Sequence, residues 1–239
     1  MAVLPGLMQD RPLMISSLVR HAAMFNGGRE VVSVGAEGAR HRYDFAQAEV
    51  RARRLAKGLQ RLGVRPGDRI ASLAWNTHRH LELFYGVPGM GAVLHTLNPR
   101  LWEDQLAYIA GHAEDRVLFF DPDLLDLVVK LAPRLPCVEH YVLLGDESDL
   151  PASAPIPLMS YETLLADDDF DWPAFDERSA SILCYTSGTT GMPKGVLCSH
   201  RSSVLHTLYA QSANAFGLTP FDGEVLVVVM FQAYDSGLP

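Results

Sequence analysis

Short apolar runs alternate with longer amphipathic stretches between residues 69 and 145. The apolar runs are rich in Val, Leu, Ile and Phe, which is typical of strands buried on both faces. The predicted strands are RIASLA (69–74), AVLHTL (92–97), RVLFFD (116–121) and HYVLLG (140–145). Helices are predicted over 78–91, 101–113 and, entered through Pro122, 123–132, and Pro88 should end or kink the first of them. This alternation predicts an α/β fold in which helices flank layered, parallel-rich sheets.

The pattern before residue 69 predicts two helices and a hairpin. Ser16 and Ser17 precede the stretch LVRHAAMF, which predicts a short capped helix. EVVSV and RHRYDF flank a glycine-containing turn at 35–38, which favours a hairpin. Residues 45–62 have an apolar helical face, and Gly63 marks the predicted stop. The solvated face of that helix should carry Arg51, Arg53 and Arg54.

The pattern divides the chain into three predicted parts. Residues 1–144 form a first α/β subdomain, and 145–178 form an acidic, proline-rich connector. Its acidic run is interpreted as a solvated loop, since charge runs are usually loops. Residues 179–239 begin a second α/β subdomain: SILCY and GVLCS are predicted strands, Ser199 caps a helix to about residue 215, and EVLVVVM (224–230) is another buried strand.

Composition narrows the classes of function. The chain has 239 residues, 48% of them hydrophobic, and a net charge of −8, which disfavours nucleic acid or an anionic membrane as the main partner. Its 3 cysteines form no C-x-x-C pair, which favours a reducing compartment. No signal peptide or run long enough to span a bilayer is evident, so we predict a cytoplasmic protein without a transmembrane segment.

The segment 185–196, YTSGTTGMPKGV, carries the most informative chemistry. Glycines let the backbone approach a ligand closely, and successive N–H groups can converge on an anion. Four hydroxyls and one lysine add donors suited to a polyphosphate, and a hydroxyl can also reach magnesium. The predicted phosphate-binding residues are Thr186, Ser187, Gly188, Thr189, Thr190, Gly191 and Lys194.

This segment differs from the common P-loop. That motif places lysine directly after glycine and continues into a helix, whereas Met192 and Pro193 precede Lys194 here and a strand-like run follows. The loop is therefore predicted to join two strands. A flexible Ser/Thr/Gly hairpin without a ligand is the alternative, and the length of the ordered motif TSGTTGxPKG argues against it.

The motif resembles the phosphate-binding signature of the adenylate-forming superfamily, which includes acyl-CoA synthetases, luciferases and peptide-synthetase adenylation domains. The stretches LAWNTHRHLELFYGVPGMGAVLHTLNPRL (73–101), YIAGHAEDRVLFFD (108–121) and CYTSGTTGMPKGVLCSHRSSVLH (184–206) are similar to medium- and long-chain fatty-acid–CoA ligases in particular. The resemblance implies ATP-dependent activation of a fatty acid to acyl-adenylate, then transfer to coenzyme A. It also implies that Lys194 and the loop amides hold the phosphates and that Thr186 lies near magnesium.

Other polar residues are weaker candidates. His200 is either a contact near the nucleotide or acyl channel or a histidine satisfied by its neighbours at a helix start. His78 and His80 lack a third ligand at sensible spacing, so zinc is not expected, and Asn98-Pro99-Arg100 is predicted to be a loop. At the C-terminal end, Gln232 stands where the resemblance implies a histidine of the substrate wall, and Val229 and Ser236 also depart from the family pattern.

The resemblance also implies further parts beyond Pro239, including the catalytic residues. We therefore expect an incomplete N-terminal portion of an adenylate-forming enzyme, truncated and inactive alone. The strand predicted at 224–230 would be a pairing edge, which favours a homodimer or a covering partner. Two other hypotheses remain: a nucleotide- or partner-binding homologue without catalysis, and a remnant that only folds or dimerises.

Overall fold

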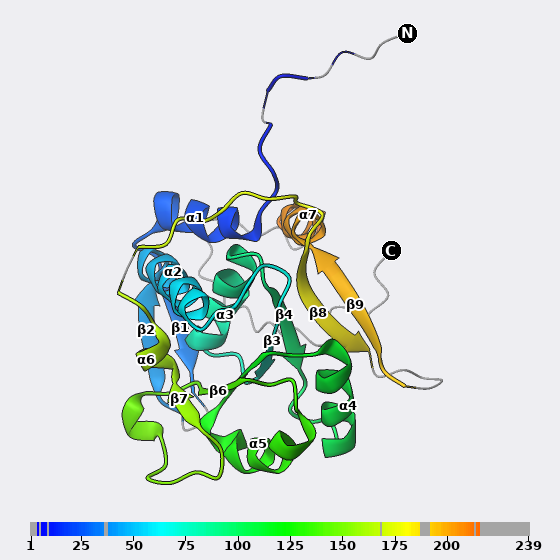
Figure 1. Ribbon diagram of the computed structural model, residues 1–239. Coiled ribbons are helices and arrows are strands. Elements are labelled where there is room, and N and C mark those ends of the chain that lie inside the picture. Colours follow the sequence, from blue (N-terminus) through cyan, green and yellow to red (C-terminus); the bar gives the residue numbers. More distant parts are fainter. Residues whose placement is uncertain are drawn as a thin grey trace.

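The computed structural model describes residues 4, 6–8, 10–35, 38–167, 169–186, 192–212, 214 and 215. Within these residues the chain forms one seven-stranded sheet and a separate two-stranded hairpin (Figure 1). The sheet strands are β3 (Arg69–Leu73), β4 (Val93–Leu97), β5 (Val117–Phe120), β6 (His140–Leu143), β7 (Leu158–Ser160), β8 (Ala180–Thr186) and β9 (Lys194–Ser199). Their spatial order is β7-β6-β5-β3-β4-β8-β9.

The strands pair in parallel except for β9, which runs antiparallel to β8. Parallel neighbours need crossover connections, and helices supply several of them. The helices are α1 (Ile15–Asn26), α2 (Phe45–Arg61), α3 (His78–Gly89), α4 (Glu103–Ala113), α5 (Leu125–Leu131), α6 (Tyr161–Leu164) and α7 (His200–Ala210). Three short 3₁₀ segments are Pro122–Leu124, Ala132–Arg134 and Glu147–Asp149. The prediction of an α/β fold with a parallel-rich sheet is confirmed.

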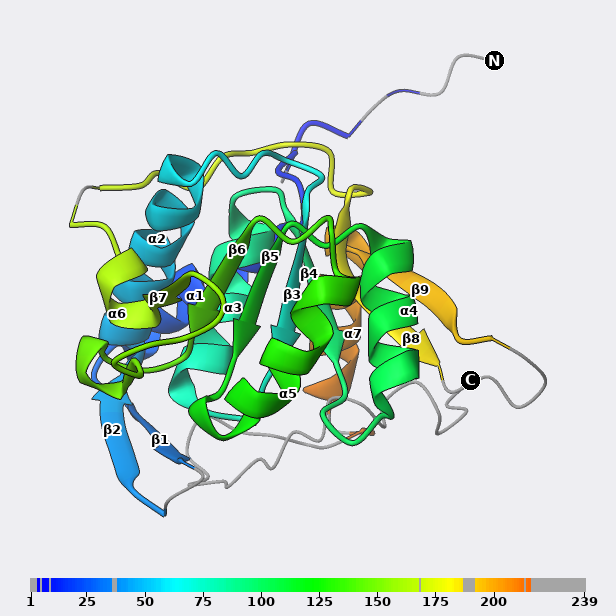
Figure 2. The same cartoon turned by 60° about the horizontal axis from the view of Figure 1, so that its bottom comes forward.

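Helices cover both faces of the sheet (Figure 2). One face packs against α2, α3 and α6 around Leu55, Leu83 and Phe119. The other packs against α4 and α5 around Leu106, Val128 and Phe120. Every residue of β4 and β5 is buried, as expected for central strands enclosed on both sides.

The hairpin predicted near the N-terminus is confirmed. Strands β1 (Glu30–Val34) and β2 (Arg40–Asp44) pair antiparallel. Asp44 then caps α2, since its side chain accepts a hydrogen bond from the Gln47 amide at 2.8 Å while Gln47 returns one to the Asp44 amide. Helix α2 ends at Arg61 and Gly63 follows with φ of 82°, a left-handed conformation that suits glycine.

Two helix boundaries differ from the predictions. Helix α1 begins at Ile15, so Ser16 and Ser17 lie inside it and no side chain caps its start. The Ser17 hydroxyl instead donates to the Met14 carbonyl at 2.6 Å, a local bond that serine can make inside a first turn. Helix α7 ends at Ala210 rather than near residue 215. Helix α3 ends at Gly89, directly after Pro88, as predicted.

The predicted connector 145–178 supplies strand β7 to the sheet edge and helix α6 beside it. Its acidic run forms no helix or strand among the described residues and exposes Asp167, Asp169 and Asp171, as predicted, but aromatic side chains within it are buried or half-buried. Phe170 and Trp172 pack on the core, and the Trp172 ring occupies the space beside Gly89, where a Cβ would lie 2.3 Å from it. The aromatic side chains between the acidic residues explain the difference, because burying them outweighs solvation of the whole segment. Strands from both sides of the connector share one sheet, and the subdomain division remains a prediction.

Candidate phosphate-binding hairpin

The motif predicted to bind phosphate lies at the end of a hairpin formed by β8 and β9. These strands pair in antiparallel register from Ala180 opposite Ser199 to Thr186 opposite Lys194. The motif therefore joins two strands, as predicted, and the first and last of its predicted ligands face each other across the hairpin. Ser187, Gly188, Thr189, Thr190 and Gly191 lie outside the described residues.

Two of the predicted phosphate-binding residues, the half-buried Thr186 and the exposed Lys194, are described. Lys194 is exposed, and among the described residues its ammonium has no ion pair; the Thr186 hydroxyl has no hydrogen bond there either. An unpaired ammonium suits a phosphate, and a hydroxyl is a hard oxygen donor of the kind that magnesium accepts. The residues present thus fit a magnesium–polyphosphate ligand in chemistry.

Sheet topology places other polar residues at the same edge. Strands β3, β4, β5 and β8 are parallel, so their carboxyl ends share one edge of the sheet. Asn98-Pro99-Arg100 follows β4, and β4 is the direct neighbour of β8. Ligands of open α/β sheets commonly bind at this carboxyl edge. The loop predicted at 98–100 therefore lies on the same side of the sheet as the phosphate motif.

The side chain of Tyr185, the first residue of the motif, packs against the sheet and α4. Its hydroxyl lies 2.6 Å from Nδ1 of His112 on α4, and its ring centroid is 5.1 Å from that of His95 on β4. Gly195 stands opposite it, where a Cβ would come within 3.3 Å of the Tyr185 ring. The backbone of Gly195 is not in the left-handed region. Its lack of a side chain serves to admit the tyrosine ring.

His200 lies at the other end of the hairpin from the motif. It follows β9 directly, and the five residue steps of that strand from Lys194 to Ser199 span roughly 17 Å. Nδ1 of His200 accepts from the Ile15 amide at 3.3 Å, and the ring meets Phe175 edge-on. Burial lowers the pKa of His200 to about 4. These contacts hold the ring in the fold through Nδ1, but Nε2 is buried without a hydrogen-bond partner among the described residues, so neighbours satisfy the ring only in part. The assignment of His200 to a substrate wall remains a prediction.

Gln232, the other substrate-wall candidate, lies outside the described residues, as do Val229, Ser236 and the strand predicted at 224–230. His78 and His80 are buried within α3 and serve local contacts: His80 Nε2 lies 3.1 Å from the Ser72 hydroxyl, and His78 Nδ1 lies 3.3 Å from the Ser33 hydroxyl. Among the described residues, no group of three or more His, Cys, Asp or Glu side chains could hold a metal ion. No helix among them is long and apolar enough to cross a membrane.

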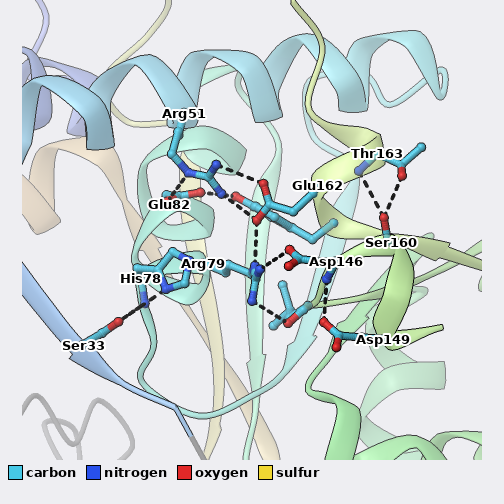
Figure 3. A network of polar contacts seen from close by, with 12 residues as sticks. Ser33, Arg51, His78, Arg79, Glu82, Asp146, Asp149, Ser160, Glu162 and Thr163 are labelled. Atoms are coloured by element: carbon cyan, nitrogen blue, oxygen red, sulfur yellow. Dashed lines mark hydrogen bonds and ion pairs between the residues drawn. The ribbon is translucent and has the colours of Figure 1, made fainter. Parts of the chain in front are cut away.

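A second polar cluster, which sequence reasoning missed, joins α2, α3 and α6 (Figure 3). Nε of Arg51 donates to Glu82 at 2.8 Å, and both Nη atoms donate to Glu162 at 2.9 and 3.0 Å. The hydroxyl of Tyr161 donates to the second oxygen of Glu82 at 2.7 Å. Arg79 bonds Glu162 as well, at 2.9 Å. The assignment of Arg51 to a solvated face is therefore wrong.

The charges of this Arg51 cluster are matched where the cluster is most buried. The Glu82 side chain is 0% exposed, and burial raises its pKa, although Arg51 and Tyr161 oppose the shift. Burial acts in the same direction on Glu162, but its hydrogen bonds with Arg51 and Arg79 outweigh burial and lower its pKa. The donors around Glu82 and Glu162 thus offset the cost of burying these carboxylates. The sequence did contain a signal for this cluster, because Glu82 is an acidic residue on the mostly apolar face of α3.

Comparisons with known proteins agree with the motif. The family described as AMP-binding enzyme matches residues 18–238. The 3-methylmercaptopropionyl-CoA ligase of Ruegeria lacuscaerulensis is 48% identical over 237 residues, which are 98% of this chain and 44% of that protein. The medium-chain-fatty-acid–CoA ligase of Ectopseudomonas oleovorans is 46% identical over 98% of this chain and 43% of its own length. The chain thus spans less than half of these relatives.

The fold also matches a solved structure. A long-chain-fatty-acid-CoA ligase from Archaeoglobus fulgidus aligns with a TM-score of 0.75 over 93% of this chain and 43% of that chain, at 21% identity. At that identity the likeness concerns the fold alone. It agrees with a mixed sheet, largely parallel and flanked by helices, as the N-terminal architecture of such enzymes.

Proposed function

Because the chain belongs to the family of AMP-binding enzymes, we propose that it contributes the phosphate-binding hairpin of an acid–thiol ligase. The observation that supports this most directly is the register of β8 and β9, which sets the exposed Lys194 opposite the half-buried Thr186. The proposed ligand is MgATP, held by Lys194, the loop amides of 187–191 and, through magnesium, Thr186. Coenzyme A is the proposed co-substrate.

The proposed reaction has two steps. The carboxylate oxygen of the acid attacks the α-phosphorus of ATP, the bond to the β-phosphate oxygen breaks, and pyrophosphate leaves. The thiol of coenzyme A then attacks the acyl carbon, losing its proton, and AMP leaves with the bonding electrons. Positive charge and N–H donors at the leaving phosphates stabilise the first step, which is the contribution we assign to Lys194 and the loop.

A binding experiment tests the role of Lys194. MgATP binding is measured calorimetrically for the wild type, for Lys194→Ala and for Lys130→Ala, an exposed lysine on α5. Loss of a charge-assisted phosphate contact should cost about 1.5–3 kcal/mol, which is a tenfold or greater loss of affinity. Lys130→Ala should bind as the wild type does. Equal affinity in all three proteins would argue against the proposed site.

For the acid, we propose a medium- or long-chain fatty acid. The relatives named above act on a medium-chain fatty acid and on 3-methylmercaptopropionate, and their identities to this chain are 46% and 48%. Calorimetric binding of acetate, 3-methylmercaptopropionate, octanoate and palmitate to the chain in the presence of MgATP would separate the two classes without requiring turnover. The fatty-acid proposal predicts the highest affinity for octanoate or palmitate, and a preference for the short thioether acid would refute it.

We also propose that residues 1–239 by themselves bind nucleotide but do not complete the reaction, because they correspond to 44% of a relative's length. ATP-dependent formation of octanoyl-adenylate by the purified 239-residue chain would contradict this proposal. If the chain binds MgATP without adenylate formation, a nucleotide-binding role is supported. A cytoplasmic location is part of the same proposal.

A homodimer is proposed on the basis of β9. This strand is the last in the sheet among the described residues, and Leu197 on it is 63% exposed. An exposed strand edge with apolar side chains is a pairing surface. Light scattering across a concentration series should show a dimer, and a monomer at high concentration would count against it.

A further inference from the structure

The phosphate motif is anchored on one side by a tyrosine whose side chain turns back onto the sheet. Tyr185 directly precedes Thr186, yet its hydroxyl reaches His112 near the end of α4. Its ring packs with Leu183, Val93 and Ala113. Because the ring and the hydroxyl are held at separate points, the backbone of residue 185 has little freedom to shift along or across the sheet.

A buried hydrogen-bonded pair lies beside the Tyr185 ring. His95 and Asp115 are both 0% exposed, and Nδ1 of His95 lies 2.8 and 3.0 Å from the two carboxyl oxygens of Asp115. Burial raises the pKa of Asp115, and His95 beside it opposes that shift. A hydrogen-bonded imidazole cannot rotate without leaving the carboxylate unpaired, so the ring beside Tyr185 is rigid.

Strand β9, opposite β8, leaves room for the Tyr185 ring. Gly195 pairs with Tyr185 across the hairpin, and a side chain there would touch the Tyr185 ring and Leu183. A neighbouring contact, Cys184 Sγ with the Thr96 hydroxyl at 3.4 Å, fixes β8 to β4 one residue earlier. By contrast, β9 has no further strand beside it among the described residues. Among the described residues, the contacts that position the motif are therefore made through β8 and its neighbour β4.

We propose that Tyr185 is a positioning residue for the phosphate motif, fixed by His112 at its hydroxyl and by the His95–Asp115 pair beside its ring. Through this anchor the sheet sets where Thr186, the residue directly after Tyr185, meets a polyphosphate. Preorganised donors bind more tightly because less ordering is needed on binding. The inference rests on the proposed function, since it assigns the anchor to the MgATP site.

The test measures MgATP affinity and unfolding midpoint together. Tyr185→Phe keeps the ring and removes only the hydroxyl, and His112→Ala removes its partner. Each should weaken MgATP binding about two- to tenfold, the range expected for one net hydrogen bond. The double variant should be no weaker than either single variant, since both changes break the same bond. His112→Gln keeps an acceptor within reach of the hydroxyl and should restore most of the affinity.

Tyr108→Phe is the matched control. Tyr108 lies one turn before His112 on α4, and its ring is 5.6 Å from the same imidazole. Removal of the Tyr108 hydroxyl should leave the MgATP affinity unchanged. If Tyr185→Phe and His112→Ala lower the unfolding midpoint but bind MgATP like the wild type, while Lys194→Ala binds weakly, the positioning role is overturned and the proposed function stands. If the wild type does not bind MgATP, both are overturned.

Discussion

The phosphate-binding hairpin and the Arg51 cluster both concentrate polar side chains, but they use them in opposite ways. In the Arg51 cluster each buried charge has a partner: Glu82 receives bonds from Arg51 and Tyr161, and Glu162 receives them from Arg51 and Arg79. At the hairpin, Lys194 is exposed and unpaired among the described residues. A matched set of charges holds helices together, whereas an exposed charge without an ion pair is available for the proposed ligand. Partnering, more than charge alone, distinguishes the structural cluster from the candidate binding residue.

The largest expected effect tests the structural side of this comparison. Glu82→Ala leaves Nε of Arg51 and the buried Tyr161 hydroxyl without the acceptor that they share, although Arg51 keeps its bonds to Glu162. Removing one partner of a buried pair costs about 3–5 kcal/mol of unfolding free energy. Urea unfolding of the variant should show this loss. Glu30→Ala, which breaks an ion pair whose side chains are 52% exposed, should cost at most about 1 kcal/mol. Similar losses in both variants would mean that burial of the pair is unimportant.

Asp121, a buried acid with no ion pair among the described residues, should behave differently from Glu162, although Arg79 nearby partly opposes the rise of its pKa. Asp121 follows β5, its Oδ2 accepts from the Trp75 amide, and burial raises its pKa to about 6 from an ordinary 3.8. Because the folded pKa is raised, its neutral form stabilises the fold fully below about pH 4, and this contribution is lost as pH rises through 6. The unfolding free energy of the wild type minus that of Asp121→Asn should therefore fall by at most about 3 kcal/mol between pH 4 and pH 7, because only the wild type loses this contribution. A difference independent of pH would refute the assignment.

Two helical glycines, one packed tightly near the Arg51 cluster and one with open space beside it, separate the effect of close packing from that of helix propensity. Gly58 lies on α2, where a Cβ would stand 2.1 Å from the carbonyl oxygen of Leu164 on α6. Gly58→Ala should therefore destabilise the protein by about 1–3 kcal/mol through overpacking. Gly111 on α4 has nothing within 4 Å of such an atom. Gly111→Ala should raise the unfolding free energy by about 0.5–1 kcal/mol. Thermal unfolding of both variants provides the measurement.

The smallest effect on stability is expected at the hairpin. Lys194→Ala removes an exposed side chain with no ion pair among the described residues, so its unfolding free energy should stay within about 0.5 kcal/mol of the wild type. Its MgATP affinity should fall at least tenfold, as argued above. A variant that loses stability as well as affinity would mean that Lys194 has a structural partner, and the contrast between the two regions would fail.

Much of the fold was predictable because the signals are local. Apolar runs bounded by polar residues located β3, β4, β5 and β6, and Pro88 and Gly63 marked the ends of α3 and α2. The absence of a helix after Lys194 was predictable from the strand-like run that follows it. The connector was harder, because the burial of Phe170 and Trp172 depends on surfaces of α2 and α3 that a local reading does not reveal.

The sequence by itself determined the element order, the strand–loop–strand nature of the phosphate motif and the family, since each depends on residues that are contiguous in the chain. Tertiary structure alone decided which polar residues act together. Arg51 meets Glu82 and Glu162 because three helices converge, and Tyr185 meets His95 and His112 because β8 is placed beside β4. Such contacts join residues that lie 31 to 111 positions apart. Periodicity along a chain carries no record of them, because it reports which face of an element is buried and not what lies against that face.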